Sequence, residues 1–185
     1  MVYVYEGAKL DLQRLRQYPA EMLRQEPSLG AESNPRVWIM REFENNQAAG
    51  LGMPLPAGRL RFYRQDSDRR PEFVGEDTIR HTPRNETVRV FTGSAFDLVG
   101  ERRRVSFAVD HSRAQAEEVF EIRVRNRKTN PVEVIVLERL YRWSTWELFA
   151  NSMPFRKTDA RTVEFRVRVE PNLERTVNYS VRYRW

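Results

Sequence analysis

The sequence predicts an all-β protein built as an antiparallel β-sandwich, and two features of its pattern support this. Apolar and charged residues alternate over short runs, which is the two-residue period of strands with one buried and one exposed face. Turn residues separate these runs at intervals of about 8–12 residues, a spacing typical of sandwiches. Only residues 9–24 carry a helical pattern, and Pro19 interrupts it, so we expect one short helix there.

The clearest strand pattern lies within residues 117–143. Three apolar residues alternate with charged residues over 119–125, and a second apolar run occupies 132–136. Residues 127–131 between the two runs are turn formers that end in Asn-Pro. We therefore expect the two runs to fold back on each other as an antiparallel hairpin at the centre of the core.

Shorter strand patterns fill most of the remaining chain. Glycine and proline residues interrupt the strand patterns over 50–58. Residues 93–100, which begin and end with glycine, are expected to form a seam, that is, a break between two sets of strands. The last two strands alternate most cleanly, with Pro171-Asn172 as the turn between them. The further strands predicted from these patterns are 2–5, 36–43, 60–64, 72–74, 77–80, 86–91, 105–109, 163–169 and 177–185.

The 185 residues are enough to bury roughly two thirds of the surface of the unfolded chain. The patterns divide the chain into a short strand plus surface linker (1–35), a first sandwich unit (36–104) and a second (105–185), the two units packed end to end. A single extended sandwich is the alternative. The strand rhythm resembles that of immunoglobulin-like or fibronectin-like stalk modules of bacterial surface proteins, a likeness of architecture only.

Composition excludes several classes of protein and partner. The chain has no cysteine, so disulfides, thiolate metal sites and cysteine nucleophiles are absent. No apolar run approaches the roughly 20 residues that span a bilayer, and we expect no membrane span. The net charge is +6, from 32 basic and 26 acidic residues, but the signs are interspersed along strands. This is typical of solvated faces, so we expect no nucleic-acid partner, and the run Arg102-Arg103-Arg104 is expected to face solvent.

No pattern indicates a cofactor, a metal or a catalytic site. The two histidines, His81 and His111, have acidic residues near them but lack any recognised metal-ligand spacing. The glycines of 50–58 are interleaved with prolines, which removes the backbone donors of a phosphate-binding loop. Acidic residues mostly occupy the polar alternates of strands and form no catalytic pair. We therefore expect a protein that is not an enzyme and that uses no cofactor.

The densest aromatic cluster begins at Tyr141. Such a cluster either plugs a core or forms an exposed platform for a sugar ring or a partner chain. If the alternation of strand faces continues from 132–136, even-numbered positions face the core, and Tyr141 and Trp143 lie on the more solvent-exposed face. Trp146 would then turn back inward as the core plug. The candidate binding residues are therefore Tyr141, Arg142 and Trp143.

Six segments of the chain are characteristic in sequence: Asn34-Pro-Arg-Val-Trp, Leu51-Gly-Met-Pro-Leu-Pro-Ala-Gly-Arg, His81-Thr-Pro-Arg-Asn-Glu-Thr-Val-Arg-Val, Phe96-Asp-Leu-Val-Gly-Glu-Arg, Leu140-Tyr-Arg-Trp-Ser-Thr-Trp-Glu and Val181-Arg-Tyr-Arg-Trp. Together they resemble one bacterial domain family of unknown function, over nearly the whole chain from about residue 34 onward. That family typically forms the C-terminal half of larger, often exported proteins, some described as mucoidy inhibitor A-like. The resemblance implies a mainly β fold, an N-terminal partner region and a periplasmic or extracellular location, and it carries no catalytic residues.

These observations lead us to expect a non-enzymatic structural or protein-interaction module, the C-terminal part of a larger envelope-associated bacterial protein. Its partner would be another protein or the upstream region of the same protein. The alternative is a glycan-binding module that uses exposed aromatics around Trp143. A role in hydrolysis is the third hypothesis, and it would require two converging carboxylates or a metal in a pocket.

Overall fold

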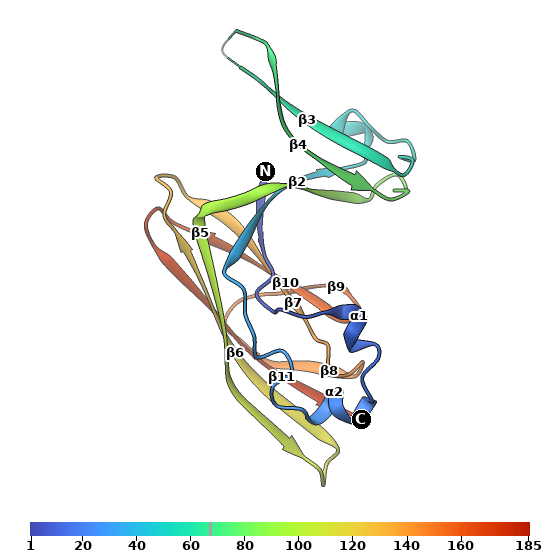
Figure 1. Cartoon of the computed structure of the whole chain (residues 1–185), viewed down its shortest axis with the longest axis vertical. Helices are drawn as coiled ribbons and strands as arrows, with labels where there is room; N and C mark the ends of the chain where they lie inside the picture. Colours follow the sequence, from blue (N-terminus) through green and yellow to red (C-terminus); the bar gives the residue numbers. More distant parts are fainter. Residues whose placement is uncertain (67) are drawn as a thin grey trace. The chain divides into compact units, whose positions relative to one another are not determined.

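The computed structural model of the chain describes residues 1–66 and 68–185, without the side chains of residues 12 and 14. Strands make up 59% of the structure and helices 6%, so the predicted all-β class is confirmed (Figure 1). The helices and strands are β1 (Val2–Tyr5), α1 (Leu12–Leu15), α2 (Ala20–Gln25), β2 (Arg36–Glu44), the short 3-10 helix η1 (Gln47–Ala49), β3 (Gly58–Gln65), β4 (Pro71–Ile79), β5 (Thr87–Asp110), β6 (Gln115–Asn126), β7 (Val132–Arg139), β8 (Trp146–Asn151), β9 (Arg156–Asp159), β10 (Thr162–Val169) and β11 (Glu174–Arg184).

Each predicted strand coincides with one of these elements to within one residue or lies inside it, but two pairs of predicted strands merge. The patterns at 72–74 and 77–80 belong to the single strand β4, and those at 86–91 and 105–109 to the single strand β5. Residues 93–100, expected to form a seam, lie inside the continuous strand β5, which pairs with β6 from Leu98 onward. Gly100 serves a different purpose there: a Cβ atom at this position would lie 2.0 Å from the Tyr5 ring.

The chain forms two compact units, residues 1–3 with 38–95 and residues 4–37 with 96–185. These bounds differ from the predicted parts 1–35, 36–104 and 105–185. One difference is that the division within β5 falls between residues 95 and 96, so residues 96–104 belong to the second unit. The other is that residues 4–35 belong to the second unit, where the Tyr5 side chain is fully buried.

The predicted hairpin between β6 and β7 is wrong. The nine strands of the large sheet pair in the order β8-β11-β6-β5-β2-β1-β7-β10-β9, while β3 and β4 form a separate hairpin. Thus β6 lies between β11 and β5, and β7 lies between β1 and β10. The buried amide of Asn126 donates to the carbonyls of Asn130 (2.9 Å) and Val169 (3.1 Å), which fixes the 127–131 connection as a crossing to β7.

The core of the second unit lies where β6 and β11 face β7 and β10. Phe120 of β6 and Phe165 of β10 stack on either side of Tyr179 of β11, with ring centroids 5.1 and 5.8 Å from it. Alternate residues of these strands are buried, as the period of two predicts. Each fully buried apolar side chain contributes about 1.5–3 kcal/mol relative to exposure to water.

The first unit is organised around Asn45, which is buried at the end of β2. Its side-chain amide donates to the carbonyls of Met53 (2.7 Å) and Pro83 (2.9 Å), and its carbonyl oxygen accepts from the Gly52 amide (3.2 Å). These bonds fix the long loop after β2, because a buried amide left without partners would cost free energy. Toward the start of β2 in the same unit, Trp38 meets Phe91 edge to face, with ring centroids 5.4 Å apart.

Replacing Val167 with aspartate is expected to lower the free energy of unfolding by more than about 3 kcal/mol, because Val167 is buried in β10 and a carboxylate there would have no partner. The matched control is Arg168→Ala on the exposed face of the same strand, expected to change stability by no more than about 0.5 kcal/mol. Urea denaturation measures both. Equal losses in the two variants would mean that the assignment of the faces of β10 is wrong.

Candidate functional site

Charged side chains are buried in the interior of the second unit, where they require opposite charges or hydrogen bonds. Four of them lie together with the partly buried Arg104 and form the strongest candidate site in the described chain. We call this group the arginine–glutamate cluster; its members are Arg102, Arg104, Glu118, Glu138 and Arg142.

Strand phase explains why the acidic members of the cluster point inward. Glu118 is on the same face of β6 as Phe120 and Ile122, and Glu138 shares the buried face of β7 with Val136. The sequence led us to expect acidic residues mainly on the polar alternates of strands. These two glutamates are exceptions. The sequence did contain a signal for this, because each glutamate lies two residues from an apolar residue on the same face of its strand.

Strand phase also corrects the expectation that Arg102-Arg103-Arg104 faces solvent. In the β5–β6 register, Arg102 lies opposite Ile122 and Arg104 opposite Phe120, so both arginines reach the inner face. Arg103, between them, is 60% exposed at its side chain and pairs with Glu121 on the outer face. Only the middle arginine of the run is therefore a surface residue.

One half of the cluster joins Arg102 to Glu138. The Arg102 Nε lies 3.1 and 3.0 Å from the two carboxylate oxygens of Glu138, and its Nη1 donates to the Gly30 carbonyl at 2.7 Å. The guanidinium lies 4.0 Å from the centroid of the Phe120 ring, and the Tyr179 hydroxyl donates to Glu138. Burial lowers the pKa of Arg102, but the Glu138 charge and hydrogen bond, together with the nearby Tyr179 and Tyr141, outweigh burial and hold that pKa above its ordinary value.

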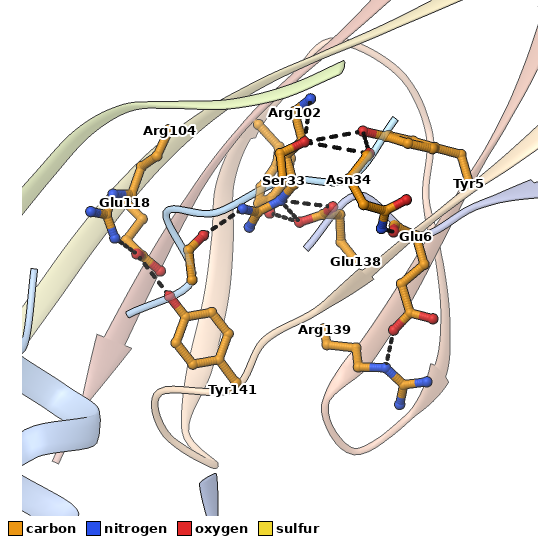
Figure 2. A network of polar contacts seen from close by, with 12 residues as sticks. Tyr5, Glu6, Ser33, Asn34, Arg102, Arg104, Glu118, Glu138, Arg139 and Tyr141 are labelled. Carbon is orange, nitrogen blue, oxygen red and sulfur yellow. Dashed lines mark hydrogen bonds and ion pairs between the residues drawn. The ribbon is translucent and has the colours of Figure 1, made fainter. Parts of the chain in front are cut away.

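The other half of the cluster is centred on Glu118. Its Oε1 atom accepts from Arg142 Nη2 at 2.9 Å and from Arg104 Nη1 at 3.1 Å, and the Tyr141 hydroxyl lies 3.3 Å away. Figure 2 shows Arg104 and Tyr141 meeting at this carboxylate. Two guanidinium groups therefore compensate one buried carboxylate, with a phenol beside it.

The remaining donors of the cluster point to the backbone of the N-terminal arm, as we call residues 6–35. Arg142 donates to the carbonyls of Leu23 (3.0 Å), Glu26 (3.1 Å) and Leu29 (3.1 Å). The Leu29 carbonyl also accepts from Arg104 at 3.0 Å and from the Tyr141 hydroxyl at 2.6 Å. The cluster thus attaches the arm to the sheet by charge-assisted hydrogen bonds, which are stronger than neutral ones.

Further contacts hold the two ends of the arm. The Asn34 side chain donates to the Glu6 carbonyl at 2.6 Å, and the Tyr5 hydroxyl donates to the Asn34 carbonyl at 2.9 Å (Figure 2). Gly30 has a φ of +72°, and a Cβ atom there would lie 2.1 Å from the Tyr141 hydroxyl oxygen. Glycine is therefore required at this close approach of the arm to the cluster.

The chemistry open to the cluster is limited by its burial. Glu118 and Glu138 have no exposed surface, and a general acid or base must reach its substrate directly or through one water. Among the residues that the structure describes, Glu118 Oε2 and Arg142 Nε are buried without a hydrogen-bond partner, but both lie inside the packed cluster. The arrangement is suited to holding the arm in place.

The structure does not place the three predicted binding residues on one exposed surface. Tyr141 and Arg142 are buried in the cluster, and Trp143 is half-buried beneath Arg24, whose guanidinium lies 3.8 Å from the centroid of the Trp143 ring. They therefore do not form an exposed platform. The expected phase fails because β7 ends at Arg139, after which the chain turns toward the arm.

Trp146, predicted as the core plug, is half-buried at the start of β8. Its indole Nε1 donates to the Ala160 carbonyl at 2.8 Å, and Lys157 lies 4.8 Å from its ring centroid. The large buried side chains of this aromatic segment are Tyr141 and Arg142 instead. Trp146 ties β8 to the β9–β10 turn.

Both histidines are exposed, and His81 Nδ1 accepts from the Ala57 amide at 3.3 Å. Within residues 1–66 and 68–185, no group of three or more histidine, aspartate or glutamate side chains could hold a metal ion. None of the helices in this part of the chain has the length and apolar character needed to cross a membrane. Comparison with known proteins finds no match among family models, curated proteins or solved structures.

Removing one member of a buried ion pair tests the energetics of the cluster. We expect Arg102→Met to destabilise the fold by about 3–5 kcal/mol, because Glu138 would remain buried without its counter-charge. Arg103→Met, at the neighbouring exposed position, should cost no more than about 0.5 kcal/mol. Denaturant midpoints compare the two, and a small effect at Arg102 would contradict a tightly coupled cluster.

The buried tyrosines predict a loss of stability at alkaline pH. Burial raises the pKa of Tyr5 to about 12 and the pKa of Tyr141, Tyr179 and Tyr183 above the ordinary value. Unfolded tyrosines lose their protons near pH 10, so above that pH the unfolded chain binds fewer protons than the folded protein and stability falls. Denaturant midpoints at pH 8 and pH 11 should show this fall. Tyr183→Phe should make this fall in stability smaller. An unchanged fall in that variant would contradict the attribution of the effect to the buried Tyr183.

Proposed function

We propose that the chain is a non-enzymatic structural or protein-interaction module, in which the arginine–glutamate cluster locks the N-terminal arm onto the sheet. One observation carries this proposal: the hydrogen bonds that the arginines of the cluster donate go to the chain's own carboxylates and arm carbonyls. A catalytic arrangement would direct such groups toward a site that a substrate can enter.

The proposal extends to the setting of the module. The resemblance of the segments from residue 34 onward to an uncharacterised bacterial family supports a place in the C-terminal part of a larger envelope-associated protein, in the periplasm or outside the cell. The partner would be the upstream region of the same protein or a second protein. In the first unit, Tyr63 and Phe73 lie opposite each other in the β3–β4 register, 56% and 53% exposed, and exposed apolar groups of this kind favour a contact role.

A paired substitution on β6 tests the structural role of the cluster. Glu118→Gln keeps the shape of the side chain but leaves Arg104 and Arg142 without a carboxylate, so a loss on the order of 3 kcal/mol is expected. Glu117→Gln removes a partly exposed partner of Arg182 on the other face and should cost less than about 1 kcal/mol. Thermal melts of the two variants measure the difference.

The same variants test the absence of enzymatic activity. We expect no turnover by the wild type in screens with ester, phosphoester, glycoside and peptide substrates. Reproducible turnover that disappears in Glu118→Gln, or in a double His81→Ala and His111→Ala variant, while Glu117→Gln keeps it, would overturn the proposal. A glycan array addresses the alternative function, because glycan binding lost in Trp143→Ala would favour a glycan-binding module.

A further inference from the structure

A cavity of about 280 Å³ lies in the second unit, between the N-terminal arm and the ends of β7, β9 and β10. Leu15 and Leu23 of the arm and the ring of Tyr141 give it an apolar lining. Small-molecule sites in proteins are mostly apolar cavities with a few placed polar groups, and this cavity has the same composition. We call it the arm-side cavity.

The charged residues that line the arm-side cavity are mainly basic: Arg16, Arg139 and Arg161, with Asp159 as the acidic member. Arg139 is already paired with Glu6. Asp159 accepts from the Arg161 amide at 2.8 Å, and although burial opposes the shift, this bond and others hold the pKa of Asp159 below its ordinary value. Arg16 and Arg161 form no ion pair with any carboxylate in the part of the chain that the structure describes.

The backbone that carries Arg161 is fixed in position. The Arg161 carbonyl accepts from the Leu140 amide at 2.7 Å, and the preceding carbonyl, that of Ala160, accepts from the Trp146 indole at 2.8 Å. With the Asp159 bond, these contacts define the β9–β10 turn on which Arg161 stands. A guanidinium on a fixed turn loses less entropy when it binds an anion than one on a mobile loop.

We propose that the arm-side cavity binds a small amphiphilic anion, a carboxylate or phosphate group carried on an apolar body. The guanidinium groups of Arg16 and Arg161 bind the anionic group, with the planar geometry that suits carboxylate and phosphate oxygens. The apolar lining formed by Leu15, Leu23 and Tyr141 receives the body of the ligand. This inference rests on the cavity alone, so it can fail while the proposed function stands, and the reverse.

Isothermal titration with phenyl phosphate tests the inference directly. We expect saturable binding that weakens as the salt concentration rises, since the contact is ionic and partly exposed. Phenol, which lacks the charge, and inorganic phosphate, which lacks the apolar body, should each bind at least about tenfold more weakly, a difference of about 1.4 kcal/mol. The same titration with octanoate distinguishes the two kinds of anionic group: tighter binding of octanoate indicates a carboxylate ligand, and tighter binding of phenyl phosphate indicates a phosphate.

Variants with equal charge locate the site. A double Arg16→Ala and Arg161→Ala variant should bind phenyl phosphate at least about tenfold more weakly with an unchanged melting temperature, because both side chains are exposed. The control is a double Arg113→Ala and Arg168→Ala variant, which removes the same charge from exposed residues that do not line the cavity and should bind as the wild type does. No saturable binding, equal weakening in both variants, or equal affinity for phenol or inorganic phosphate would overturn the inference.

Discussion

A charge removed from water must find its compensation inside the protein, and the second unit depends on this constraint. Glu118 and Glu138 are fully buried, and three arginines reach inward to meet them. The donors that remain on these arginines then require acceptors, which the carbonyls of the N-terminal arm supply. Helix α2 of the arm has no fully buried residue, and the Leu23 carbonyl within it accepts from Arg142.

The positions of the β-strands could be predicted from the sequence, but the pairing of the strands could not. The bounds of β10 were predicted to within one residue and those of β11 to within three, because the alternation of apolar and polar residues in both sequences is uninterrupted. The β6–β7 hairpin was predicted wrongly because a turn sequence indicates a change of direction and not the strand that will be the neighbour. The decisive interaction, the Asn126 amide with the Val169 carbonyl, joins residues far apart in the chain.

The candidate site could be predicted from the sequence only in part. Strand phase alone places Glu118 and Glu138 among apolar neighbours, so both glutamates could have been identified as buried. The burial of Tyr141 could not, because the chain leaves strand geometry after Arg139 and the alternation stops there. The attachment of the arm left no pattern in the sequence, because the arm bonds through backbone carbonyls, which every residue possesses.

The central claim is that the arginine–glutamate cluster holds the N-terminal arm on the sheet, and hydrogen–deuterium exchange of wild type and Arg142→Met tests it most directly. Arg142 donates to three arm carbonyls, so its loss should accelerate exchange of the amides in residues 20–35 while β6 and β11 stay protected. Arg103→Met, which changes a surface arginine of β5, should leave the arm as it is in the wild type. Unchanged protection of the arm in Arg142→Met, with the protein folded, would contradict the account.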